Sequence, residues 1–227
     1  MRNLIIILSF MPVFSSCSEA NPNPKGTNDS QLADSLHFDT YVVTFIRELT
    51  DSVFSPVTGN MEEFLDMDLD SEDTVALIPG FYFQESQETA DRIIDTLHKN
   101  LLEKGYLLLK VKQGFGGQLH SDKLAVFKTS DKFEILRLFQ TNGINHDLNT
   151  REVIARLREF DSELDLDLIG AGGDWCEFTI GKNPTNWNDL SNRIYSFCPD
   201  VVDQGTQTVE LLESEIKQTG TLYFWWD

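Results

Sequence analysis

The segment 149–180 reads NTREVIARLREFDSELDLDLIGAGGDWCEFTI and joins one helical pattern to two strand patterns. Asn149, followed three residues later by Glu152, is a capping-box signal for the start of a helix. The apolar residues that follow it at helical spacing are Val153, Ile154, Leu157 and Phe160. Residues 164–169 and 175–180 are rich in apolar and β-branched side chains and flank a glycine-rich turn, so they are predicted to be strands.

The same signals extend outward from this segment in both directions. Strands are expected over residues 74–83, 106–112, 123–129 and 221–226. Helices are expected over residues 87–104, 132–141, 186–197 and 208–218. Residues 36–46 fit either a strand or a helix. Paired strands between helices favour an α+β fold, a mixed β-sheet packed by helices, over a doubly wound parallel fold.

Residues 1–16 have the pattern of a signal peptide. A basic start at Arg2 precedes an apolar run from Leu4 to Phe14, which is too short to span a bilayer. The sequence Phe14-Ser15-Ser16-Cys17 then resembles a bacterial lipobox, although phenylalanine replaces the usual leucine. Cleavage before Cys17 and diacyl or triacyl lipidation, including palmitate, would anchor the protein stably to a membrane. The alternative is ordinary secretory cleavage near Ala20, which would leave no anchor.

The predicted organisation has four parts. A signal peptide (1–16) precedes a lipidated flexible tether (17–35), which is rich in Asn, Pro, Ser and Asp. An N-terminal α+β region (36–122), which belongs either to the same domain or to its own, precedes a C-terminal domain (123–227). Position 18 is not the aspartate that tends to retain lipoproteins at the inner membrane, so the outer membrane is favoured.

The protein is strongly acidic, with 37 Asp and Glu against 18 Lys and Arg and a formal net charge of −19. Nucleic acid is excluded as an expected partner, because phosphate binding needs a cationic face. Two explanations of the negative charge are open: it keeps the protein soluble, or it attracts a basic protein partner. Residues 62–73 concentrate seven acids but lack the EF-hand glycine and the final glutamate, so a solvated loop is predicted there.

No cofactor or metal site is predicted. The glycine-rich segment 114–117 lacks the Lys-Ser or Lys-Thr of a phosphate-binding loop and precedes a strand, so it is interpreted as a turn. The four histidines are scattered, without a second histidine at ligand spacing. His146 stands beside Asp147, which could orient its ring, but no nucleophile is near in sequence.

Three motifs distinguish the C-terminal region: Gly173-Asp174-Trp175, the segment FCPDVVDQG at 197–205, and YFWWD at 223–227. Together with Gly143-Ile144-Asn145 and Asp147, they resemble the bacterial domain-of-unknown-function family 4253. The resemblance runs from about Lys123 to Asp227, nearly half of the chain. It names a domain and implies no activity.

The candidate binding surface comes from these motifs. Its residues are Asp174, Trp175, Glu177, Asp200, Asp203, Gln204, Trp225, Trp226 and Asp227. One hypothesis gathers the acids Asp174, Glu177, Asp200 and Asp203 into a pocket walled by tryptophans. The alternative gives Asp200 and Asp203 a structural role at the start of the helix after Thr208. Trp225 and Trp226 should point to opposite sides of their strand.

Cys176 and Cys198 fit apolar positions, so buried thiols are predicted in preference to a disulfide or a nucleophile. The preferred function is a non-enzymatic, membrane-anchored protein-binding module, for example an immunity-like protein that meets a basic toxin. The alternative hypothesis is a metal-dependent or acid–base hydrolase that uses the acidic C-terminal pocket.

Overall fold

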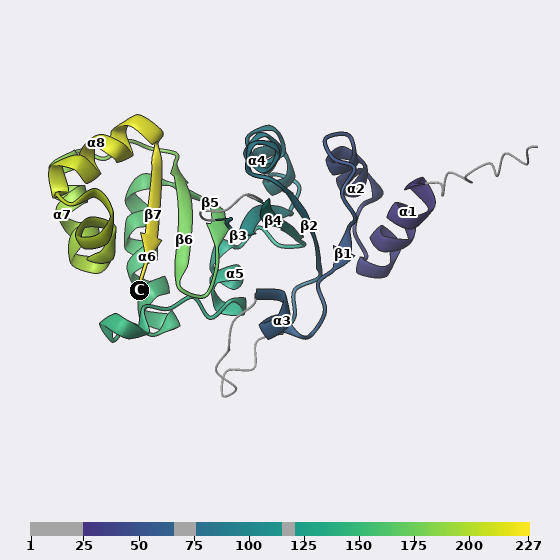
Figure 1. The fold of residues 1–227 in the computed structure, drawn as a ribbon, viewed down its shortest axis with the longest axis horizontal. Helices are drawn as coiled ribbons and strands as arrows, with labels where there is room; N and C mark the ends of the chain where they lie inside the picture. The colour runs from purple at the N-terminus through teal and green to yellow at the C-terminus, as the bar shows by residue number, and fades with distance from the viewer. Residues whose placement is uncertain (1–24, 66–75, 115–120) are drawn as a thin grey trace, which may run out of the picture.

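The computed structural model describes residues 25–65, 76–114 and 121–227, and within them seven strands form one mixed sheet (Figure 1). The strands are β1 (Ser55–Pro56), β2 (Gly80–Ser86), β3 (Leu107–Lys112), β4 (Ser121–Phe127), β5 (Leu166–Ala171), β6 (Trp175–Ile180) and β7 (Thr221–Trp225). Their order is β1-β2-β4-β3-β5-β6-β7. Neighbours are antiparallel except for β3 and β5, which are parallel. The expected α+β class is confirmed.

One sheet joins the two regions that the sequence suggested. β4 begins at Ser121 and lies between β2 and β3, so the expected boundary at residue 123 falls inside a central strand. The parallel contact between β3 and β5 follows from the two helices that connect β4 to β5. Consequently the C-terminal motifs are built on strands that continue the N-terminal half of the sheet.

Helices cover both faces of the sheet. They are α1 (Lys25–Leu36), α2 (Thr40–Arg47), α3 (Met61–Leu65), α4 (Gln87–Leu102), α5 (Lys132–Leu138), α6 (Thr150–Leu164), α7 (Trp187–Phe197) and α8 (Val209–Thr219). Two single turns, η1 (Ile144–His146) and η2 (Val201–Thr206), complete the described elements. Figure 1 shows α1 and α2 at the end of the sheet that carries β1, and α7 and α8 at the opposite end, beside β7.

Two hydrophobic clusters account for the packing. The first lies under α1, α2 and α4 and includes Phe81, Ile93 and Leu108. The second lies under α3 and α5 to α8 and extends to Phe178 and Phe224. Residues 107–111 of β3 are all buried, because helices cover this central strand on both sides. On β6 and β7 burial alternates, and the face opposite the second cluster is only partly covered.

The helix-start signals are confirmed by side-chain caps. Asn149 accepts hydrogen bonds from the amides of Arg151 and Glu152, and Glu152 accepts from the amide of Asn149, which completes the capping box of α6. At the starts of α4 and α5, the Ser86 side chain accepts from the Thr89 amide and the Asp131 side chain accepts from the Phe133 amide. The residues that form these bonds are three or fewer positions apart, so the pattern can be recognised in the sequence alone.

Three expectations near the N-terminal end of the described chain need correction or refinement. The tether prediction is wrong over residues 25–35, which form α1. Arg47 donates two hydrogen bonds, of 2.8 and 2.9 Å, to Asp29, and Ala33 is fully buried, so tertiary contacts stabilise a helix with little apolar pattern. The ambiguous segment 36–46 is mainly the helix α2. Within the described residues, the strand expected over residues 74–83 begins at Gly80, because Pro79 has no amide hydrogen for the ladder. Residues 74 and 75 lie outside the described part of the chain.

Several predictions fall outside the described residues. These are the signal peptide, Cys17 with the first part of the tether, most of the acidic segment 62–73, and residues 115–117 of the glycine-rich turn. Within the described part, Glu62 and Glu63 lie in α3. The strands on either side of the glycine-rich segment, β3 and β4, are paired antiparallel as expected for strands joined by a turn.

Candidate functional site

A short loop between α5 and α6 is held rigidly beside the end of β7. The amides of Gly143 and Leu148 each bond the carbonyl of the other residue, at 2.8 and 3.0 Å, and close the loop. At its base, the Asn142 amide donates to the Gly173 carbonyl at 2.8 Å. The tip of this closed loop is Ile144, whose side chain remains 70% exposed. A fixed backbone therefore presents an apolar side chain to solvent.

Asp200 connects this loop to the C-terminal strand. Its carboxylate accepts hydrogen bonds from His146 Nε2 at 2.7 Å, from the Asp227 amide at 3.0 Å and from Gln204 Nε2 at 3.0 Å. Asp200 itself is only 7% exposed. Burial alone would raise the pKa of Asp200, but these three hydrogen bonds together lower it below its usual value. One buried carboxylate thus joins three segments that are distant in sequence.

These contacts revise two expectations, the role of Asp200 at the start of α8 and the orientation of His146 by Asp147. The start of α8 is capped by Thr208, whose hydroxyl accepts from the Leu211 amide, so Asp200 does not serve that helix. The carboxylate that orients His146 is Asp200, not the adjacent Asp147. The two residues are 54 positions apart, and no local pattern in the sequence relates them.

The motif tryptophans pack on glycines that lie in the motifs or next to them. The pairs are Gly172 with Trp175, Gly205 with Trp225, and Gly143 with Trp226. A Cβ added to these glycines would lie 2.1, 2.7 and 2.7 Å from the respective indole ring, closer than real contacts allow. Each glycine is required because an aromatic ring lies directly against its backbone.

The two C-terminal tryptophans differ in burial, as predicted. Trp226 is 2% exposed and packs against Phe197 and Phe224 in the second hydrophobic cluster. Trp225 is partly exposed, on the opposite side of the strand, beside Tyr223. Trp226 therefore acts mainly in packing, and only a small part of it reaches a surface.

A groove of about 560 Å³ lies between this loop and the ends of β3, β6 and β7, and we call it the C-terminal groove. Its lining residues are Leu65, Val111, Lys112, Gln113, Asn142, Ile144, Asn145, Gly172, Gly173, Asp174, Trp175, Trp226 and Asp227. Motif residues from three separate segments thus meet in one place. Asp174, Asp227 and Asn145 contribute polar side chains, while Trp175 and Ile144 contribute apolar ones.

The carboxylates of the groove influence each other. Burial raises the pKa of Asp174, and the nearby charge of Asp227 raises it further. Asp227 is exposed, and its backbone amide is fixed by Asp200. The arrangement therefore holds two acidic groups close together at the surface, where a cation would relieve their repulsion.

The remaining predicted residues lie elsewhere. Glu177 projects from β6 on the partly covered sheet face, where Gln113 Nε2 donates to it at 3.1 Å, and burial raises its pKa. Asp203 is exposed and accepts a hydrogen bond of 2.9 Å from the Tyr195 hydroxyl. Gln204 binds Asp200. The four acids therefore do not form one pocket, and Gln113 links Glu177 indirectly to the groove.

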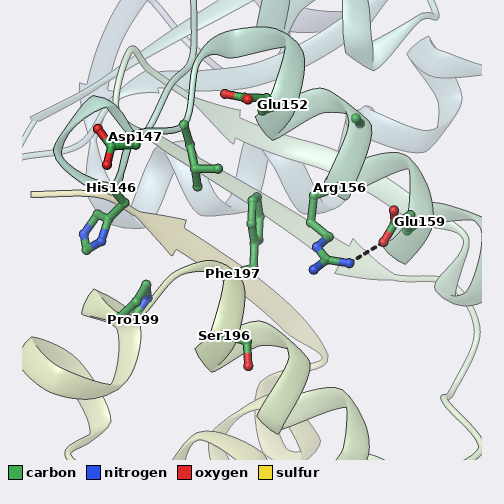
Figure 2. Close-up of a pocket in the computed structure, with 10 residues that line it drawn as sticks. His146, Asp147, Glu152, Arg156, Glu159, Ser196, Phe197 and Pro199 are labelled. Carbon is green, nitrogen blue, oxygen red and sulfur yellow. Dashed lines mark hydrogen bonds and ion pairs between the residues drawn. The ribbon is translucent and has the colours of Figure 1, made fainter.

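A second pocket, of about 510 Å³, lies on the other side of His146 between α6 and α7. Figure 2 shows His146 and Pro199 at one end of it and the Arg156–Glu159 ion pair of α6 at the other. The His146 side chain is 28% exposed. Because Nε2 bonds Asp200, the other ring nitrogen is the one left to interact with a molecule in this pocket.

Neither a metal cluster nor a membrane-spanning helix is found in the described part of the chain. Across residues 25–65, 76–114 and 121–227, no three His, Cys, Asp or Glu side chains form a group that could hold a metal ion. Within the same ranges, the helices are too short or too polar to cross a bilayer.

Cys176 and Cys198 are buried free thiols, which confirms the predicted core role. Cys198 Sγ donates to the Trp225 carbonyl at 2.9 Å. Burial raises the pKa of Cys198 to about 12 and that of Cys176 well above its usual value. A nucleophilic thiolate at either position is therefore disfavoured.

We expect both thiols to react with iodoacetamide at pH 8 at least about 100-fold more slowly in the native protein than in denaturant. The reason is that burial suppresses both access and ionisation. Peptide mapping by mass spectrometry measures each site separately from Cys17. Rapid alkylation of native Cys198 at single-site stoichiometry would contradict its assignment as a core thiol.

Residues 123–227 match the family model described as Domain of unknown function (DUF4253), which confirms the resemblance drawn from the motifs. The match covers β4 from its third residue to the end of the chain, including the Asp200 contacts and the groove residues from Asn142 onward. The other lining residues, Leu65, Val111, Lys112 and Gln113, lie outside it. No curated protein and no solved structure matches the chain.

Proposed function

We propose that this protein is a lipoprotein anchored through Cys17 to the bacterial cell envelope, favouring the outer membrane, and that its C-terminal groove binds a protein partner. The anchor is supported by the basic start, short apolar run and lipobox-like Phe14-Ser15-Ser16-Cys17. The binding role does not require a reaction, and the protein is not expected to need a cofactor.

One observation carries the binding role: the closed loop holds Ile144 70% exposed at the edge of a groove that also contains Asp174 and Asp227. A large apolar side chain on a rigid backbone binds with little loss of conformational entropy. An apolar centre with a polar rim is typical of protein interfaces. Asp174 and Asp227 are both exposed residues, as expected of groups available to a partner.

The anchor is tested by mass spectrometry of protein extracted from membranes. The expected N-terminal peptide begins at Cys17 and carries acyl chains. A Cys17→Ser variant should leave the membrane fraction, while a Ser16→Ala variant, which keeps a small residue at that position, should remain in it. An unmodified N-terminus elsewhere would refute the anchor and leave the binding role to be judged separately.

The binding role is tested by placing a photo-crosslinking amino acid at position 144 in native membranes. A discrete crosslinked protein is expected, since Ile144 would be covered by the partner. The matched control is position 211, where Leu211 is 55% exposed on α8, outside the groove. If positions 144 and 211 crosslink to the same mixture of proteins, or if neither position crosslinks, the groove does not bind a specific partner.

A second candidate function is acid–base hydrolysis, and the His146–Asp200 pair favours it. A carboxylate 2.7 Å from Nε2 fixes the ring orientation, and His146 faces the pocket between α6 and α7. The lining of this pocket includes Ser196, but its hydroxyl donates to the Asn192 carbonyl at 2.9 Å rather than to His146. Any hydrolysis would therefore use water as the nucleophile.

A panel of fluorogenic esters, phosphoesters, glycosides and peptides separates the two functions. Turnover that falls at least about 100-fold in a His146→Gln variant would favour the enzyme, because glutamine retains a donor for Asp200 but is no base. Turnover unchanged by this substitution would exclude His146 as the base.

A further inference from the structure

The charges of the C-terminal groove define the chemistry of a partner. The lining residues include two acids, Asp174 and Asp227, and a single basic residue, Lys112. The whole protein carries a net charge of −19, so its long-range field attracts cations and repels anions. Both the local and the overall charge therefore favour a basic ligand.

The apolar walls of the groove suit a long basic side chain. Trp175 is partly exposed, and its ring is fixed against Gly172 and stacked with Tyr223 at 5.8 Å. The methylene stem of Lys or Arg packs well along such a surface while its charged end stays near carboxylates. The amide side chain of Asn145 offers a further hydrogen-bonding group in the lining.

The backbone that carries the groove residues is preorganised. The loop is fixed at Gly143, Leu148 and His146, and the Asp227 amide is fixed by Asp200. The two carboxylates and Ile144 are consequently presented from a common framework. A partner would not have to order these backbone segments on binding, which improves affinity for a given contact area.

We propose that the C-terminal groove receives a basic, partly apolar peptide segment, with one Lys or Arg side chain between Asp174 and Asp227 and an apolar side chain against Ile144. This inference rests on the proposed binding function and specifies its partner. The lining has two carboxylates and one basic residue, Lys112, so a neutral or acidic segment would leave an excess of negative charge in the groove and should be rejected.

The test selects a random 12-residue peptide library on the full-length protein in detergent. Clones are retained if they lose binding to an Ile144→Ser variant and keep binding to a Leu211→Ser variant. The Ile144→Ser variant removes an exposed apolar side chain inside the groove, and the Leu211→Ser variant removes one outside it. The retained clones are thus defined by the groove, independently of their charge.

The retained peptides are expected to be rich in Arg and Lys. Their affinity should fall about tenfold in an Asp174→Asn/Asp227→Asn variant and should also fall with added salt. The matched control is Glu103→Gln/Glu215→Gln, which removes two exposed acids outside the groove and should leave affinity within about twofold.

Two other outcomes have distinct meanings. Groove-dependent peptides without basic enrichment, unaffected by loss of the two carboxylates, would overturn this inference and leave the binding function intact. A library that yields no groove-dependent peptide at all would count against both the inference and the proposed binding function.

Discussion

Replacing Trp226 by alanine is expected to lower the free energy of unfolding by about 4 kcal/mol. The indole is 2% exposed and lies 5.3 Å from the Phe197 ring and 6.2 Å from the Phe224 ring, centroid to centroid. Its removal leaves a large cavity in the second hydrophobic cluster. Urea unfolding followed by circular dichroism measures the loss without relying on tryptophan fluorescence.

A double-mutant cycle with Gly143 identifies the contact responsible. Gly143 has φ −125°, outside the left-handed region that favours glycine, yet an added Cβ would lie 2.7 Å from the Trp226 ring. Gly143→Ala alone should therefore cost about 2 kcal/mol through overpacking. In the Trp226→Ala background the same substitution should cost almost nothing, which gives a coupling energy of about 2 kcal/mol.

Gly59→Ala is the matched control for this cycle, because no atom lies within 4 Å of its added Cβ. It should change stability by less than about 0.5 kcal/mol in either background. An equal cost for Gly143→Ala with and without Trp226 would contradict the packing role assigned to the glycine.

The sequence predicted those parts of the fold whose signals are local. The capping box of α6 involves residues 149 to 152, and the burial of β6 alternates with the strand period. α1 was missed because its stability comes from contacts such as Asp29 with Arg47, 18 residues away, rather than from its own apolar pattern. Tertiary contacts of this kind leave little trace in a short segment.

The site shows the same division between local and distant signals. The motifs identified the family correctly, but the structural roles of their residues depend on partners far along the chain. The His146–Asp200 bond spans 54 residues and the Asp200–Asp227 bond spans 27. The sequence holds one further signal: each of the three tryptophans in the motifs packs on a glycine that lies in a motif or next to one.

Asp200→Ala is expected to lower the free energy of unfolding by about 3 kcal/mol at pH 7, because His146, Gln204 and the Asp227 amide all lose their acceptor. Asp203→Ala is the matched control in the same turn. Asp203 is exposed and accepts one hydrogen bond from Tyr195, so its loss should cost less than about 0.5 kcal/mol.

The effect of Asp200 should depend on pH with a definite sign. Its pKa is lower in the folded protein than the unfolded value of about 3.9. The stability contributed by its ionisation is therefore complete above that value and is lost as pH falls through the lower, folded pKa. The difference between wild type and Asp200→Ala should shrink below about pH 4. Urea unfolding at each pH measures it, and a difference that grows as the pH falls below about 4 would show that the Asp200 carboxylate is not stabilised by its partners in the folded state.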